Sequence, residues 1–245
     1  MTSTLGNILS LTMIPVAATI MGGTIAAYRV PGEHLRSFLQ HFAAGVVLAA
    51  VAGELLPAIT KGHQPLGVVI GFTIGVLTML GVKQLAGHLE SRAERQAEAT
   101  QGGNTSLLAV VGIDVLIDGL LIGVGFAAGE RVGLLLVIAL TLELLFLGIS
   151  VAASLGNAQT PRRQTILSIV GLSLLVVLGA LIGGTLLSGL SGMALEIVLS
   201  FGAAALMYLV VEELLTEAHE VRETPLTTGA FFAGFVALYL LELMS

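Results

Sequence analysis

The sequence predicts an all-α integral membrane protein with eight transmembrane helices. Two features of the composition indicate a membrane-embedded chain: the mean hydropathy is +1.00, and only 11% of the 245 residues are charged. The third observation is that apolar runs of about 20 residues, long enough to cross the hydrocarbon core of a bilayer, recur along nearly the whole chain. We therefore expect a single transmembrane domain over residues 1–245.

The predicted helices are separated by short segments that hold most of the charges. Their approximate spans are residues 5–28, 37–58, 66–87, 106–128, 132–155, 165–188, 194–216 and 226–244. The first run has no preceding basic residue and is longer than a signal-peptide core, so we expect it to be retained as a helix. The longest connection, residues 88–105, reads as a charged helix tail followed by a cytoplasmic loop.

The basic residues predict the orientation of the helices. With both termini outside, 8 of the 10 Lys and Arg residues lie on the cytoplasmic side: Arg29, Arg36, Lys83, Arg92, Arg95, Arg162, Arg163 and Arg222. The opposite loops hold Lys61 and Arg131. This distribution follows the positive-inside rule, and we expect the protein in the lipid bilayer of a bacterial inner membrane.

The composition also excludes several functions. The chain has no cysteine, which excludes disulfides, thiolate metal ligands and thiol catalysis. With few basic residues and no basic patch, we expect no nucleic-acid partner.

Three acidic residues lie near the middle of predicted helices, where an ionised carboxylate costs about 2.5–3.5 kcal/mol. Asp114 and Asp118, in the stretch GIDVLIDG, are four residues apart and share one helix face. Glu143 lies at a similar depth in the next helix, which a short link makes an antiparallel neighbour. No Lys or Arg lies mid-helix to balance these charges, so the pattern predicts a site for a metal ion or a proton. The alternative is that each acid is protonated and hydrogen-bonded to a nearby carbonyl or hydroxyl group.

The positions of the other acidic residues within the predicted helices distinguish them from these three. Glu196 and Glu242 lie near helix ends, where we expect them to be solvated. Glu212 and Glu213 are consecutive and point about 100° apart on a helix, so only one of them can face the fourth and fifth helices.

Three motifs resemble those of the zinc- and iron-regulated transporter-like (ZIP) family. The run HFAAGVVLAAVAGELLP (residues 41–57) is similar to the family's AAGxMLAA and ELLPE, and FGAAALMYLVVEELLTEAHE (residues 201–220) to its MxYVxxEExxPEAH. GIDVLIDGLLIGVGF resembles the family's fourth helix, usually His-Asn-x-x-Asp/Glu-Gly. The resemblance covers nearly the whole chain. It implies a ZIP-like bundle with inverted-repeat character that moves divalent cations (Zn, Mn, Fe, Cd class) toward the cytoplasm by alternating access.

The family pattern implies four metal ligands: Asp114, Asp118, Glu143 and Glu213. The chain departs from the pattern at neighbouring positions, where Asp114 replaces a histidine and Val115 an asparagine, while Leu144 and Leu147 replace ligands of the fifth helix. We therefore expect one carboxylate-rich site rather than a two-metal centre. Oxygen donors favour Mn²⁺, Mg²⁺ or Ca²⁺, with Fe²⁺ and Zn²⁺ still compatible.

The expected partners follow from this site. Four carboxylates carry more charge than one divalent ion neutralises, so at least one should hold a proton, and protons join divalent metal ions as partners. We expect no cofactor apart from the transported ion, and a homodimer is left open. Glu217, His219 and Glu220 would lie at the cytoplasmic end of the path and Glu54 and His63 at its entrance, with solvated helix ends as the alternative.

Two other functions remain as alternatives. A ZIP-fold carrier of protons or another cation that has lost metal transport would explain the missing ligands. An intramembrane hydrolase would need two aspartates facing across helices, whereas Asp114 and Asp118 share one helix, and GxGD and HExxH motifs are absent. The prediction is a transporter rather than an enzyme.

Overall fold

The computed structural model describes residues 2–97, 103–187, 189–222 and 224–244. Over these residues, eight helical segments are long and apolar enough to cross a membrane. Five are single helices: α1 (Thr2–Tyr28), α4 (Pro65–Ala97), α5 (Gly103–Ala128), α6 (Glu130–Asn157) and α7 (Arg162–Leu186). A sixth, α10 (Pro225–Met244), closes the chain. The predicted all-α fold with eight spans is confirmed.

The second and seventh spans each contain a π-helical turn. The second consists of α2 (Glu33–Ala50), η1 (Val51–Leu55) and α3 (Leu56–Gly62). The seventh consists of α8 (Gly192–Leu209), η2 (Val210–Leu214) and α9 (Leu215–Ala218). A π turn widens the helix locally and is often found at functional sites. Both turns contain glutamates singled out from the sequence, Glu54 in η1 and Glu213 in η2.

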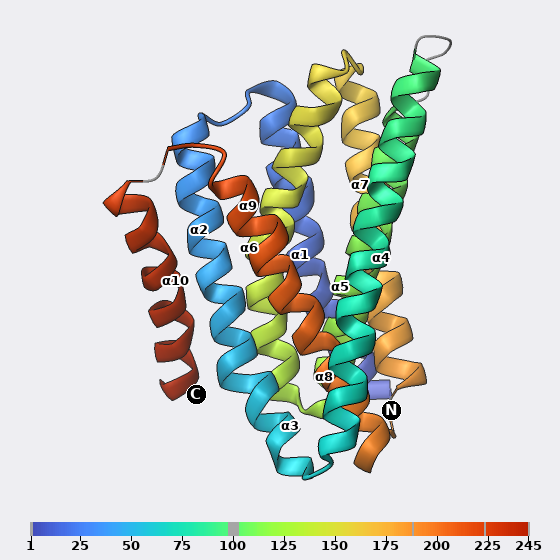
Figure 1. The fold of residues 1–245 in the computed structure, drawn as a ribbon, viewed down its shortest axis with the longest axis vertical. Coiled ribbons are helices and arrows are strands. Elements are labelled where there is room, and N and C mark those ends of the chain that lie inside the picture. Colours follow the sequence, from blue (N-terminus) through green and yellow to red (C-terminus); the bar gives the residue numbers. More distant parts are fainter. Residues whose placement is uncertain (1, 98–102, 188, 223, 245) are drawn as a thin grey trace.

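The contacts between the helices labelled in Figure 1 divide them into two groups. Helices α1, α5, α6 and α7 pack extensively on one another, and we call them the first group. The second group contains two close pairs, α2 with α10 and α4 with α8, which meet through α3, η1, η2 and α9. The two groups touch mainly where α2 contacts α6 and where α4 contacts α5.

Glycines allow the closest approaches inside each group. A Cβ at Gly119 would overlap the carbonyl of Val176, and one at Gly179 the carbonyl of Leu116, so α5 and α7 are in backbone contact. Gly45 faces the carbonyl of Phe231 in the same way, between α2 and α10. Small residues therefore bring helices together within the groups, as they commonly do in membrane proteins.

The first and last helices have their outer ends on the same side of the bundle, as an even number of spans requires. Helix α1 begins, and α10 ends, toward the lower end in Figure 1, on the side of the α3–α4 and α5–α6 turns. Within the predicted 88–105 connection, α4 continues to Ala97 and α5 begins at Gly103, so the helices are longer than hydropathy suggested. The rest of that connection, residues 98–102, lies outside the described residues.

Candidate metal centre

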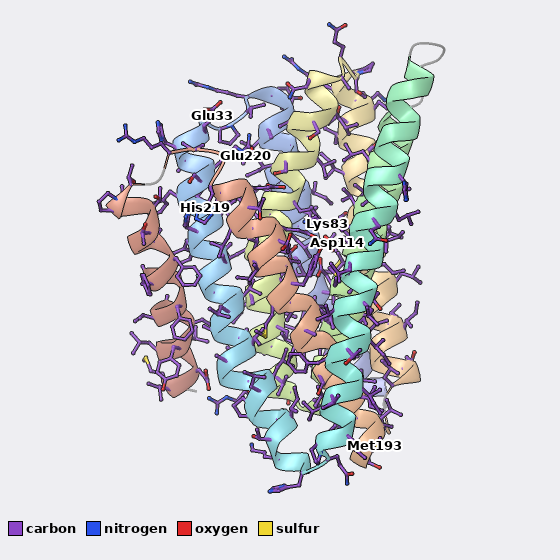
Figure 2. The ribbon with its side chains drawn as sticks, viewed as in Figure 1. Glu33, Lys83, Asp114, Met193, His219 and Glu220 are labelled. Atoms are coloured by element: carbon purple, nitrogen blue, oxygen red, sulfur yellow. The ribbon has the colours of Figure 1, made fainter. Side chains whose placement is uncertain are left out.

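Three carboxylates meet in the middle of the bundle. Asp114 and Asp118 project from α5 and Glu143 from α6, and one oxygen of each lies within 4.8 Å of the others. The side chains are buried, with exposures of 6%, 1% and 3% respectively. Asp114 lies at a height between Met193 at one end of the bundle and Glu33 and Glu220 at the other (Figure 2). The predicted convergence of these residues is therefore present.

Two oxygens of this cluster lack a hydrogen-bond partner. Oδ2 of Asp118 and Oε2 of Glu143 are inaccessible to solvent and receive no hydrogen bond from any described residue. Leaving a buried polar atom unpaired costs free energy, about 1–3 kcal/mol and more when it is charged. The alternative, in which each acid is protonated and hydrogen-bonded to a nearby carbonyl or hydroxyl group, does not account for these two atoms.

The spacing of the oxygens suits a single cation. Calcium-like ions bind oxygen at about 2.3–2.6 Å, so ligands on opposite sides of one ion are about 5 Å apart. Oxygens no more than 4.8 Å apart can therefore all contact one ion. A donor set made only of carboxylates favours hard cations over those that prefer imidazole or thiolate.

Glu213 lies beside the cluster but outside the 4.8 Å group. It shares a cavity of about 20 Å³ with Glu143, and further walls come from Gln40, Ser150 and Glu217. Its charge is close enough to interact with Asp114, Asp118 and Glu143. As a direct ligand, Glu213 remains a prediction.

Glu212 points to a different partner. Its carboxylate forms an ion pair with Lys83 of α4, so the two consecutive glutamates of η2 face different surroundings. Lys83 lies at nearly the height of Asp114 in Figure 2. This geometry agrees with the expectation that only one of these glutamates faces the fourth and fifth predicted helices, which are α5 and α6 in the structure.

Hydrocarbon side chains stand at the positions where the family resemblance implies ligands of a second metal site. Val115 and Leu144 are fully buried, and Leu147 lines the cavity beside Glu143. None of these side chains can ligate a cation. This arrangement leaves the carboxylate cluster as the candidate site within the described helices.

Polar residues continue from the cluster toward the end of the bundle where α9 ends. The amide nitrogen of Gln40 donates to Glu217 Oε2 at 2.6 Å, and the hydroxyl of Ser150 donates to the same oxygen at 3.1 Å. Glu217 also lines a wider cavity of about 140 Å³, which includes Glu33 and Glu220. Sequence reasoning found Glu217 but missed Gln40 and Ser150, because an uncharged polar residue in an apolar run gives no signal of its partner.

The remaining end residues have separate surroundings. The rings of His219 and His41 meet edge to face with centroids 5.2 Å apart. At the opposite end, Glu54 pairs with Arg131, whereas Nδ1 of His63 lies 2.9 Å from the carbonyl oxygen of Lys61. His63 is exposed in the α3–α4 turn and has a left-handed backbone conformation, with φ 58°.

The prediction that Glu196 is solvated is wrong. Its side chain is 3% exposed, and neither carboxylate oxygen has a hydrogen-bond partner among the described residues. The start of α8 is covered by the α3–α4 turn, and the carboxylate lies against Gly62, where a Cβ would overlap it. Closeness to a helix end therefore did not mean closeness to solvent. Glu242, the other residue expected to be solvated, is half-buried.

Comparison with known proteins identifies the family. The family model described as ZIP zinc transporter matches residues 86–242, which include all three residues of the cluster and Glu213. The zinc transporter ZIPB of Bordetella bronchiseptica is 31% identical over 242 residues, covering 92% of this chain and 77% of the relative. The chain therefore belongs to the ZIP family of metal-ion transporters.

Proposed function

We propose that this protein carries divalent cations of the Zn, Mn, Fe and Cd class into the cytoplasm through a single carboxylate-rich site. The observation that carries the proposal is the buried cluster of Asp114, Asp118 and Glu143, with its oxygens within 4.8 Å of one another. Two oxygens in that cluster have no hydrogen-bond partner within the described ranges, which further supports a cation as the occupant. Glu213 would complete the site from the second group of helices.

The division into two groups supports transport by alternating access. Three of the four acids belong to the first group and Glu213 to the second, so the site lies where the groups meet. Movement of one rigid bundle against another around a central site is a common transport mechanism. The distribution of the basic residues supports an orientation with the α9 end of the bundle in the cytoplasm.

The donor set favours Mn²⁺ and other hard ions over Zn²⁺. Asp114 supplies oxygen where the family usually has histidine, and the nitrogen donors that favour Zn²⁺ are absent from the cluster. Zinc nevertheless remains within the proposed class, because carboxylates also bind it.

One observation favours a second function. The hydrocarbon at Val115, Leu144 and Leu147 removes possible ligands, which is expected if the chain moves protons or another cation and no longer carries metal. The two functions differ in what crosses the membrane when the carboxylates are intact.

Uptake into proteoliposomes separates them. Liposomes containing a metal-sensitive dye and, in parallel, a pH-sensitive dye are exposed to Mn²⁺, Zn²⁺ or Cd²⁺. The proposal expects metal uptake that Asp118→Ala abolishes and Glu212→Gln, outside the cluster, preserves. A proton flux without any metal uptake would support the second function instead.

A further inference from the structure

An ion pair joins the two groups of helices at the end where α6 begins. The Nε atom of Arg131, in the first turn of α6, lies 3.2 Å from Oε1 of Glu54 in η1. A second guanidinium nitrogen donates to the backbone carbonyl of Glu242, near the end of α10. One side chain of the first group therefore holds two helices of the second.

The burial of the two partners differs. The side chain of Glu54 is 11% exposed and that of Arg131 is 51% exposed, so the carboxylate lies inside and the guanidinium covers it from outside. Other charged groups close enough to affect Glu54 are Glu242 and Lys61. Neither of these residues belongs to the first group.

The ion pair between Lys83 and Glu212 provides a contrast, because it does not join the two groups. Lys83 and Glu212 join α4 to η2, and both elements belong to the second group. Movement of one group against the other leaves this pair intact. The pair of Arg131 and Glu54 has to break or stretch.

A repeat in the sequence shows which residue Arg131 holds. The π turns Val51–Leu55 and Val210–Leu214 begin with the same spacing, Val-x-x-Glu-Leu-Leu, which makes Glu54 the counterpart of Glu213. The two spans run in opposite directions, and the hydroxyl of Ser37 near the start of α2 donates to the carbonyl of Ala218 at the end of α9. The two glutamates thus lie on opposite sides of the bundle's middle. Glu213 faces the carboxylate cluster, whereas Glu54 faces a guanidinium.

We propose that Arg131 is a tethered cation that closes one end of the transport path by occupying Glu54, the structural counterpart of Glu213. The inference rests on the proposed function, because it assigns a gate to the same path. With the pair formed, the first and second groups are locked together at the α6 start, and a cation arriving there meets a positive charge. Opening that end requires Arg131 to leave Glu54.

Solvent access to a single introduced cysteine tests the gate. The natural chain has no cysteine, so a reporter has no background. Ala50 is 1% exposed and lies one turn before Glu54, and its counterpart in the repeat, Leu209, is 2% exposed. Each is replaced by cysteine in the full-length protein in nanodiscs, which expose both faces, and labelled with a charged thiol reagent in metal-free buffer.

The gate predicts an asymmetric result. Arg131→Gln should speed labelling of Ala50→Cys by at least about tenfold and leave or slow that of Leu209→Cys, whereas Lys83→Gln should change neither. The exchange Arg131→Glu with Glu54→Arg should restore slow labelling at Ala50→Cys, because it rebuilds an ion pair between the same helices. That restoration also excludes a general loss of folding.

Two outcomes would overturn the proposal. One is unchanged labelling of Ala50→Cys when Arg131 is replaced, and the other is an equal rise at both reporters. Since no metal is present, the result is independent of the proposed cargo. If Arg131→Gln shifts the labelling rate but the parent protein takes up no metal, the gate stands and the proposal of metal transport fails. If the parent takes up metal but the labelling rate does not shift, metal transport stands and the gate fails.

Discussion

Replacing Asp118 by asparagine should change stability and cation binding in opposite directions. Asp118 is 1% exposed, one of its oxygens lies within 4.8 Å of oxygens of two other carboxylates, and its Oδ2 receives no hydrogen bond from the part of the chain that the structure describes. Asparagine keeps the size of the side chain and removes the negative charge. In the cation-free protein this removes a source of repulsion, whereas in the bound protein it removes a ligand charge.

The spacing sets the magnitude. At an effective dielectric constant of 20, two unit charges 4.8 Å apart interact by about 3.5 kcal/mol, which corresponds to roughly 300-fold in an equilibrium constant. A proton shared among the carboxylates of the cation-free cluster makes the gain in stability from Asp118→Asn smaller, but the substitution still stabilises the fold. Each kcal/mol of relief raises the unfolding midpoint of a chain of this size by about 2–4 °C. Cation affinity should fall at least 100-fold.

The assays have to suit the composition. The chain has no tryptophan and no cysteine, so thermal unfolding in detergent is followed by circular dichroism rather than by indole fluorescence or a thiol dye. Binding of Mn²⁺ and Cd²⁺ is measured by isothermal titration. Glu196→Gln is the matched control, because it also neutralises a buried carboxylate that has no hydrogen-bond partner among the described residues but lies outside the cluster. It should leave cation affinity unchanged.

One combination of results would contradict a ligand role for Asp118. If Asp118→Asn lowers the cation-free midpoint and keeps the affinity within about threefold of the parent, the aspartate is a hydrogen-bonded structural group. The cluster would then need another explanation.

Three further predictions concern the same bundle. Asp114→His should move preference from Mn²⁺ toward Zn²⁺ in competition uptake, because imidazole replaces a hard oxygen; unchanged selectivity would argue that Asp114 is not a ligand. Cation binding should weaken as pH falls, since protons compete for the carboxylates, with about one proton released per ion and less for Asp114→Asn; titrations in buffers of different ionisation enthalpy count these protons, and a count of zero near neutral pH would contradict the competition. Gly45→Ala should lower the unfolding midpoint, because its Cβ would overlap the backbone of Phe231, by the equivalent of about 1–3 kcal/mol. Gly171→Ala, which meets nothing within 4 Å, is the control, and equal midpoints would mean that α2 and α10 separate easily.

The spans were predictable because hydropathy and length depend on the chain alone. The cluster of Asp114, Asp118 and Glu143 was also predictable, since a four-residue spacing fixes one face of a helix and the short link at Gly129 fixes the antiparallel neighbour. These are local rules. They hold before the helices are arranged in space.

The remaining features depend on contacts between distant helices. No local pattern indicates that Arg131 meets Glu54 or that Gln40 meets Glu217, because these partners are 77 and 177 residues apart in sequence. The burial of Glu196 depends on the turn that covers α8. The π turns also escape hydropathy, which averages over a window longer than the turn itself.

The division of acids between the groups constrains how an ion would pass. Under the proposed mechanism, an ion held by Asp114, Asp118 and Glu143 would move with the first group, so Glu213 would bind it only where the groups bring them together. In the present arrangement Glu143 and Glu213 share a cavity with Glu217, and Glu217 also lines the wider cavity beyond. Glu54, the counterpart of Glu213, is meanwhile held by Arg131.

Under the proposed mechanism, this arrangement directs the ion toward the α9 end while the α6 start is closed. Between the small cavity beside Glu143 and the wider cavity at the α9 end, Gln40 and Ser150 both donate hydrogen bonds to Oε2 of Glu217. Neither of these two bonds involves Oε1. Neutral donors are easier to separate from a carboxylate than a guanidinium is, because the guanidinium adds the attraction between two opposite charges to its hydrogen bond. The two ends of the path therefore differ in the strength of their closure. The α9 end should open first, so the ion leaves there before Arg131 releases Glu54.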